Sequence, residues 1–330
     1  MAIKNKKMKL TKELILALTC LKEVGVKGVG PRKIITIGNL VRDNDVEIKN
    51  IKDLHAVMLQ VVKFVTIEDL SDAYTYAQRL IKKSTDNGIG LIGYYDDEFP
   101  EILRRTINEE GKLNPPLLLW YRGDLSVLQM PGLAVIGTRE ATPVGVAGGE
   151  YLSGAFAKRG FNIVSGLAVG CDTSGHLGAL KAGGRTTAFL ANGLDNDSIY
   201  PPENQDLAEE IVQNGGLLLS EYRIGTKVNR YNLVARDRLQ AGLSLATLVV
   251  MTGIKGGTMH AANTTIKAGK PLFVMRFKDE ATNQHEKCLG NAYLNKLGAK
   301  YISGADDLDV IAEYIIKGSK PVSRDLFSQS

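Results

Sequence analysis

The chain has 330 residues, of which 44% are hydrophobic, and its formal net charge is +5. This length favours two domains, and the lack of any run of about 18 apolar residues argues against a membrane-spanning helix. The positive charge permits a polyanionic partner, whereas an aromatic content of 6% argues against an extended surface for base stacking. If a nucleic acid binds, phosphate contacts should dominate.

Cysteine and histidine usage argues against a metal site. Cys20, Cys171 and Cys288 lie far apart, and the four histidines lack the spacing of metal ligands. We expect reduced thiols, no metal and no cofactor. The basic residues 1–10 are not followed by the apolar core of a secretory signal, so a cytoplasmic protein without membrane contact is expected.

Residues 1–85 are predicted to form an N-terminal helical domain. Apolar residues recur at helical spacing around 14–21, 54–61 and 73–81. The turn Gly28-Val29-Gly30, followed by proline and basic residues, is typical of two helices joined by a hairpin. A helix-hairpin-helix or SAM-like domain is expected. The turn either offers amides to a phosphate or only connects the helices.

From about residue 86, short β-rich runs alternate with helical runs. Strands are predicted at 91–95, 117–121, 133–137, 162–166, 186–191, 217–221, 246–251 and 271–277. Helices are predicted at 145–159, 173–182, 203–213, 232–242, 258–268 and 306–317. This alternation favours an α/β fold with a mainly parallel, doubly wound sheet, in which ligands bind beyond the carboxyl ends of the strands.

We place the α/β domain at 86–303. The segment 304–330 is expected to hold one helix and a frayed polar tail, too short for a winged-helix domain.

The first glycine segment is Gly137-Thr138-Arg139, which ends a predicted strand before a helix. Backbone amides, a hydroxyl and a forked guanidinium together suit a phosphate. The segment is not GxGxxG, so dinucleotide binding is weakly supported. The alternative is a tight turn with a surface arginine.

The second segment runs from Ser165-Gly166 to Asp172 and His176. Glycine allows the backbone to approach a ligand closely, and Asp172 is expected to cap the helix that begins near residue 173. A Ser–His–Asp triad is disfavoured because Ser165 lies outside a GxSxG motif. His176 is expected to be packed or capping, and Cys171 to be a small buried residue.

Two basic segments follow. Arg236 and Arg238 flank Asp237 in a predicted helix, and residues two apart do not share a helix face, so one arginine could reach a ligand while the other packs. The turn Lys255-Gly256-Gly257-Thr258 opens another helix and offers a second phosphate cradle, although it is not a P-loop. Two such cradles could hold one nucleotide or successive phosphates of a strand.

The order of these segments resembles that of the DprA/Smf family (DNA-processing protein A). The resemblance covers about residues 94–277, and the ordered set is specific although no single motif is. The motifs are, in chain order, Tyr95…Phe99-Pro100; Pro115-Pro116…Tyr121-Arg122-Gly123-Asp124; Gly137-Thr138-Arg139; Ser165-Gly166-Leu167-Ala168…Gly170…Asp172…His176; Gly193-Leu194-Asp195…Tyr200-Pro201; Ser220-Glu221-Tyr222; Arg236-Asp237-Arg238…Ala241-Gly242-Leu243-Ser244; and Gly256-Gly257-Thr258.

The resemblance implies an extended Rossmann-like domain that binds single-stranded DNA as a homodimer and is not an enzyme. Members of this family protect incoming strands during natural transformation and help to load a RecA-type recombinase in DNA recombination. By this resemblance, Arg139, Ser165, Gly166 and the 256–258 turn would line the phosphate pocket. Further candidates are Lys181, Arg185, Arg236 and Arg238.

The chain also departs from the family pattern. Asp237 stands where the family usually has asparagine, Gly256-Gly257-Thr258 replaces Ser-Gly-Ser, and Met251-Thr252 lacks the expected acidic residue. An added carboxylate weakens a phosphate pocket unless it is paired. The biological setting, whether transformation, a mobile element or defence, therefore stays open.

Two alternative functions stay open. One is a nucleoside-monophosphate phosphoribohydrolase, which needs a glutamate shortly after its glycine turn, where this chain has His260 and Ala261. The other is a sensor that binds a free nucleotide without turnover.

Overall fold

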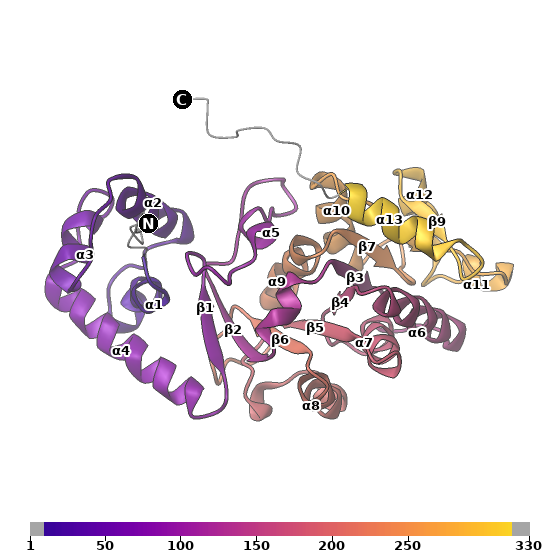
Figure 1. Cartoon of the computed structure of the whole chain (residues 1–330), viewed down its shortest axis with the longest axis horizontal. Coiled ribbons are helices and arrows are strands. Elements are labelled where there is room, and N and C mark those ends of the chain that lie inside the picture. The colour runs from indigo at the N-terminus through magenta and orange to yellow at the C-terminus, as the bar shows by residue number, and fades with distance from the viewer. Residues whose placement is uncertain (1–9, 319–330) are drawn as a thin grey trace, which may run out of the picture.

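The computed structural model describes residues 10–318, and it has an α/β fold built on one nine-stranded sheet (Figure 1). The strands are β1 (Gly90–Gly93), β2 (Leu118–Gly123), β3 (Gly132–Ile136), β4 (Asn162–Ser165), β5 (Arg185–Leu190), β6 (Leu217–Ser220), β7 (Ala246–Val249), β8 (Leu272–Met275) and β9 (Lys300–Ile302). The mainly parallel, doubly wound sheet that the sequence predicts is confirmed.

Helices precede the sheet and connect most of its strands. The α-helices are α1 (Lys12–Cys20), α2 (Pro31–Asp43), α3 (Ile51–Met58), α4 (Ile67–Thr85), α5 (Glu101–Arg104), α6 (Pro143–Lys158), α7 (Cys171–Lys181), α8 (Gln205–Gln213), α9 (Arg230–Leu243), α10 (Thr258–Lys267), α11 (Glu280–Gln284), α12 (Leu289–Lys296) and α13 (Leu308–Gly318). Short 3-10 helices are η1 (Leu21–Val24), η2 (Leu125–Gln129), η3 (Asn196–Ser198) and η4 (Pro202–Asn204).

The strand order is β1-β2-β6-β5-β4-β3-β7-β8-β9. Strand β2 pairs antiparallel with β1 and β6, and the seven strands from β3 to β9 are joined by parallel pairs. The chain continues from β3 to β4, which pairs with β3 on one side, and β7 pairs with β3 on the other side. The topological switch point therefore lies beyond the carboxyl ends of β3, β4 and β7, where open α/β sheets bind ligands.

The two faces of the sheet are covered by different helices, and side chains of β3 pack into a different core on each face. Leu133 and Val135 share a core with α6 residues, whereas Ile136 packs in a core with α10 and α12 residues. Every residue of β3 is buried, as expected for a strand covered on both faces. Helix α9 lies with α10 and packs against β3, β4 and β5.

Helices α1–α4 gather at one end of the sheet, beside β1 and β2 (Figure 1). Tyr95 links them to the sheet: its hydroxyl donates to the Ile35 carbonyl oxygen at 3.2 Å. Gly38 leaves room for the Tyr95 ring, because a Cβ atom at Gly38 would lie 2.1 Å from the tyrosine oxygen. One hydrophobic core runs from these helices into the sheet.

Residues 278–305 fold into α11, α12 and β9, none of which the sequence pattern predicts. The reason is that the buried residues of α12 include Gly290 and Asn291, while apolar side chains lie on its exposed face. The predicted polar tail, 323–330, lies outside the described residues. Within 10–318, no helix is both long and apolar enough to cross a bilayer.

Candidate functional site

A pocket of about 600 Å³ opens beyond the carboxyl ends of β3 and β7, at the switch point of the sheet. We call it the rim pocket. Its walls come from the loop after β3, the amino-terminal half of α9, the loop before α10 and the residues before α12. The predicted residues that line it are Gly137, Thr138, Arg139, Arg236, Lys255, Gly256, Gly257 and Thr258.

The loop after β3 is held by its neighbours, which leaves Arg139 exposed at the rim. Gly137 cannot carry a side chain, because a Cβ atom there would lie 2.4 Å from the Cys171 sulfur. The Thr138 amide donates to the Met251 carbonyl oxygen at 2.7 Å, and the Thr138 hydroxyl accepts from the Glu140 amide at 3.2 Å. The loop therefore presents the Arg139 guanidinium from a fixed backbone.

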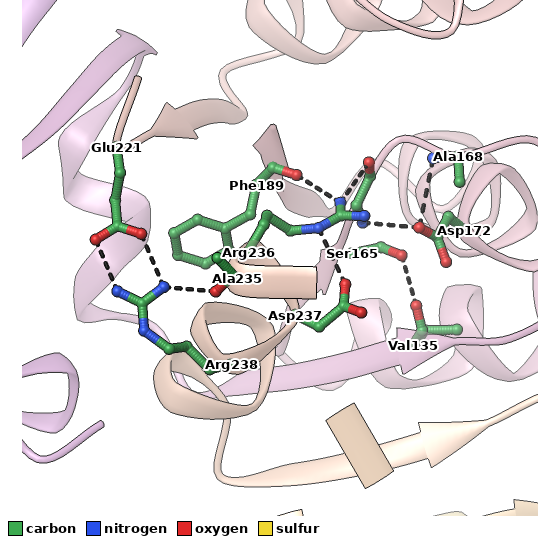
Figure 2. Close-up of polar contacts among 11 residues, drawn as sticks. Val135, Ser165, Ala168, Asp172, Phe189, Glu221, Ala235, Arg236, Asp237 and Arg238 are labelled. Carbon is green, nitrogen blue, oxygen red and sulfur yellow. Dashed lines mark hydrogen bonds and ion pairs between the residues drawn. The ribbon is translucent and has the colours of Figure 1, made fainter. Parts of the chain in front are cut away.

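The loop after β4 is closed by internal hydrogen bonds. The Ser165 hydroxyl donates to the Val135 carbonyl oxygen at 2.6 Å, and the Gly166 amide donates to the Asp172 carboxylate at 3.1 Å (Figure 2). The predicted helix cap is wrong, since α7 begins at Cys171 after Gly170 and the Asp172 carboxylate turns back to the loop. Ser165 and Gly166 are buried, and neither lines the rim pocket.

Arg236 supports this loop from α9. Its Nη1 donates to the carbonyl oxygens of Gly166 at 2.6 Å and Phe189 at 2.7 Å, and its Nε lies 3.2 Å from the Asp237 carboxylate (Figure 2). A Cβ atom at Gly166 would lie 1.7 Å from Nη1, so glycine is required there for Arg236 to fit. Arg236 forms part of the pocket wall, with most of its donors already used.

Two carboxylates in the pocket wall have raised pKa values. Burial raises the pKa of Asp172, and the nearby Arg236 charge opposes that shift. Burial also raises the pKa of Asp237 to about 6, with Arg236 again opposing it and Asp172 adding to it. Both acids face a guanidinium, so the negative charge that Asp237 adds to the pocket is partly compensated.

The loop before α10 opens into the pocket. Gly256 has a φ of +139°, a conformation that favours glycine, and nothing lies within 4 Å of a Cβ atom built on it. Helix α10 begins at Thr258 without a side-chain cap. Thr258 lines the pocket beside exposed Lys255, whereas the next two amides, those of Met259 and His260, donate to the Gly256 and Gly257 carbonyl oxygens at 3.2 and 2.9 Å. The loop therefore offers an anion the Lys255 ammonium and the Thr258 hydroxyl.

Three basic side chains at the rim carry no ion pair with a described residue: Arg139, Arg230 and Lys255. Lys287 also lines the pocket, but its ammonium lies 2.7 Å from Glu140 and 3.5 Å from Glu286. Sequence reasoning missed Arg230, because the helix was expected to start at 232, and Lys287, because no element was expected there.

Three predicted residues lie away from the pocket. Arg238 is buried in a bidentate pair with Glu221, at 2.7 and 2.8 Å (Figure 2). Lys181 ends α7 and pairs with Glu150 at 2.5 Å, and Arg185 begins β5. Because parallel strands end together, the first residue of β5 lies at the opposite edge of the sheet from the rim pocket.

The residues that resemble a catalytic triad are engaged elsewhere. His176 is buried, its Nδ1 lies 2.7 Å from the Thr186 hydroxyl, and burial lowers its pKa to about 3. Cys171 is buried as expected, and burial raises the pKa of its thiol to about 12. All three cysteines are free, and residues 10–318 bring together no cluster of three histidine, cysteine or acidic side chains suited to a metal.

Residues 90–313 match the model of a family described as DNA recombination-mediator protein A. Protein Smf of Synechocystis sp. is 40% identical over 194 residues, which are 58% of this chain and 46% of that protein. DNA processing protein DprA of Streptococcus pneumoniae is 32% identical over 201 residues, 60% of this chain and 67% of that protein. The chain thus matches about half the length of the Synechocystis relative.

Solved structures extend the similarity to most of the chain. The X-ray structure of DNA processing protein A from Streptococcus pneumoniae has a TM-score of 0.72 at 25% identity, covering 93% of this chain and 99% of that one. A structure that concerns the single-stranded DNA binding mode of DNA processing protein A from Helicobacter pylori has a TM-score of 0.57 at 30% identity. It covers 69% of this chain and 96% of that one.

Proposed function

Because this chain belongs to the DNA recombination-mediator protein A family, we propose that it is a DNA-processing protein that holds the phosphate backbone of single-stranded DNA in the rim pocket. The observation that carries the proposal is an open pocket surrounded by three cations without a described ion-pair partner, Arg139, Arg230 and Lys255, and also lined by Thr258, the first residue of α10. The Helicobacter pylori relative, whose structure concerns single-stranded DNA binding, supports the choice of ligand.

The chemistry of the pocket favours phosphates over bases. Among its described lining residues there is no aromatic side chain, so bases have nothing to stack on inside it. Arg139 and Lys255 are exposed at the rim, where successive phosphates of a strand can reach them. Recognition through phosphates is tolerant of sequence and strongly dependent on salt.

The test of this proposal is the variant Arg139→Ala. We expect weaker binding of every oligonucleotide sequence alike, and a salt dependence of log K that is smaller by about 0.7 for each phosphate of a single strand that the variant no longer neutralises. Fluorescence anisotropy over a salt series measures both quantities.

Lys181→Ala is the matched control, because it removes a cation at the opposite edge of the sheet and should bind like the parent protein. An Arg139→Ala protein with unchanged affinity and salt dependence would contradict the proposal. Competition by a free mononucleotide as strong as that by a strand would instead favour a nucleotide sensor.

The proposal extends to what the protein does once it has bound single-stranded DNA. On the family resemblance, we propose that the protein protects single strands, assists a RecA-type recombinase and is not an enzyme. We also propose that it acts in the cytoplasm. The engaged Ser165 hydroxyl and the buried His176 are consistent with a binding protein, because neither offers a nucleophile or base to the pocket.

We also propose that the protein is a homodimer. Leu289, Tyr293 and Leu297 lie four residues apart along α12 and its C-cap, and they are 41%, 43% and 48% exposed, which gives this helix an outward apolar stripe. Lys287 of the rim pocket lies two residues before the stripe. Pairing through α12 would thus bring the rim pockets of two protomers close together, where both could bind the same DNA strand.

A further inference from the structure

We propose that single-stranded DNA leaving the rim pocket continues to a second basic groove on the N-terminal helices, where Arg79 and Lys83 of α4 and Arg223 hold its phosphates. The inference rests on the function proposed above and adds a second contact site to it. The groove has a volume of about 540 Å³ and is lined by α4 and by the loop after β6. We call it the α4 groove.

The α4 groove is built on one face of α4. Tyr76, Arg79 and Lys83 occupy positions i, i+3 and i+7, which share a helix face. Across from them, Arg223, Gly225 and Thr226 form the other wall (at the end of α4 nearest the sheet). The groove therefore lies at the junction between the helical region and the sheet.

The charges of the α4 groove suit a polyanion. None of its described lining residues is acidic. Arg223 is held in place, because its Nη1 lies 3.0 Å from the Tyr76 hydroxyl and 3.2 Å from the Glu23 carboxylate. Its guanidinium also stacks on the Tyr76 ring, at 5.8 Å from the centroid.

The two α4 cations are unpaired, unlike their neighbour. Arg79 and Lys83 are exposed, and no described carboxylate lies within ion-pair distance of either. Lys82 does not line the groove, and its ammonium pairs with Asp86 at 3.1 Å. Basic residues near a helix C-terminus complement the helix dipole, but that does not explain why Arg79 and Lys83 line the same groove as Arg223.

One segment of the chain, 223–230, lines both the α4 groove and the rim pocket and connects them. An adjoining cavity of about 520 Å³ shares Leu80, Arg223 and Thr226 with the groove and extends to Asn229. The next residue, Arg230, lines the rim pocket. The segment 223–230 thus carries the cations Arg223, Lys227 and Arg230 from one site to the other.

A single strand fits this path better than a duplex. On the proposed path, a strand would pass the start of α9 and cross from the sheet to the helices, which requires it to bend. A single strand follows such a groove without the deformation energy that a duplex requires. A strand of a few nucleotides would fill the rim pocket alone, and a longer one would reach both sites.

The test compares strand lengths in the full-length protein. The double variant Arg79→Glu/Lys83→Glu is measured against Lys63→Glu/Lys82→Glu, which changes the net charge equally on the same helical region. We expect both variants to bind an oligothymidine of about 6 nucleotides like the parent protein. With one of about 30 nucleotides, the groove variant should bind at least about tenfold more weakly, because the second tethered site no longer holds the strand.

The salt dependence gives a second readout. For the longer strand, the slope of log K should fall by about 1.4 in the groove variant, which corresponds to two phosphate contacts. Without any mutation, the longer strand should also protect the Lys83 amine from chemical acetylation, detected by mass spectrometry, whereas the short strand should not. Lys82 serves as the internal control and should stay reactive.

The results separate this inference from the function on which it rests. A groove variant that binds the longer strand like its charge-matched control, or loses affinity equally for both lengths, overturns the α4 groove and leaves the rim pocket standing. If Arg139→Ala leaves the affinity for both lengths unchanged, the rim pocket itself is overturned, and the continuation from it falls with it.

Discussion

Asp237 stands in the wall of a pocket that we propose to bind phosphates, with a pKa of about 6. Its carboxylate lies 3.2 Å from Arg236 Nε, and Asp172 and His260 are the other ionisable groups that act on it. At pH 7.5 the carboxylate is ionised and repels phosphate. As the pH falls through about 6 it gains a proton, and the repulsion disappears.

We therefore predict that affinity for single-stranded DNA rises as the pH is lowered from 7.5 to 5.5, and that Asp237→Asn removes part of this rise. At pH 7.5 the variant should bind about fivefold more tightly, since one charge across a hydrated pocket contributes about 1 kcal/mol. Anisotropy titrations at several pH values measure this. A variant with the pH profile of the parent protein would contradict the assignment of this effect to Asp237.

The same carboxyl group affects stability in a defined direction. The pKa of Asp237 is raised in the folded state from its ordinary value of 3.8 to about 6, so the folded protein binds more protons than the unfolded chain between those values. The contribution of this carboxyl group to the free energy of unfolding is fully present below its unfolded pKa of 3.8 and is lost as the pH rises through its folded pKa of about 6. Asp237→Asn should consequently flatten the thermal stability profile in this window.

Helix α9, which carries Arg236, is held at its carboxyl end by a buried cation. The Lys270 ammonium donates to the carbonyl oxygens of Ala241, Gly242 and Ser244 at 2.7, 2.9 and 2.7 Å. Carbonyls at the end of a helix have no partners within the helix, so the ammonium satisfies them. Burial lowers the pKa of Lys270 to about 8, so the ammonium form still dominates at neutral pH.

Lys270→Met should keep the apolar stem and lose this cap. We predict a fall of about 3 kcal/mol in the free energy of unfolding, because hydrogen bonds from a charged donor are removed and buried carbonyls stay unpaired. Urea denaturation measures it, with Lys296→Met on the exposed end of α12 as the comparison. Equal stability of the two variants would show that water replaces the ammonium.

The elements of the α/β region could largely be predicted from the sequence, because its strands are short apolar runs separated by amphipathic helices. The pattern 133–137 became β3 at Gly132–Ile136, and 258–268 became α10 at Thr258–Lys267. Prediction failed where burial does not follow hydrophobicity. In α12 the buried face includes Gly290 and Asn291, and β9 has only three residues.

The site was only partly predictable, because proximity in sequence to a glycine loop does not fix which edge of the sheet a residue reaches. Helix α7 begins at the rim, so Lys181 at its other end lies about 15 Å further along, given a rise of about 1.5 Å per residue. Arg236 and Arg238 do face different ways, as their spacing predicts. Both are buried, and only Arg236 lines the pocket.

For the whole molecule, the proposed dimer predicts how substitutions on α12 and α13 change the oligomeric state. Tyr293→Asp places a charge in the middle of the α12 stripe and should convert the dimer to a monomer, measured by light scattering on a size-exclusion column. Val310→Asp, at a 63% exposed position on α13, should leave the dimer intact. A parent protein that is already monomeric, or a Tyr293→Asp protein that stays dimeric, would contradict this interface.

The two edge strands of the sheet differ in how they are protected from pairing with another chain. At one flank, α1 and α4 pack against β1. At the other, β9 contributes three residues, and the Lys300 ammonium sits 3.9 Å from the centre of the Tyr314 ring. An unprotected outer strand is a template for lateral aggregation, and short length and lysine are common defences. The short β9 with its lysine therefore gives another sheet little to pair with at this flank.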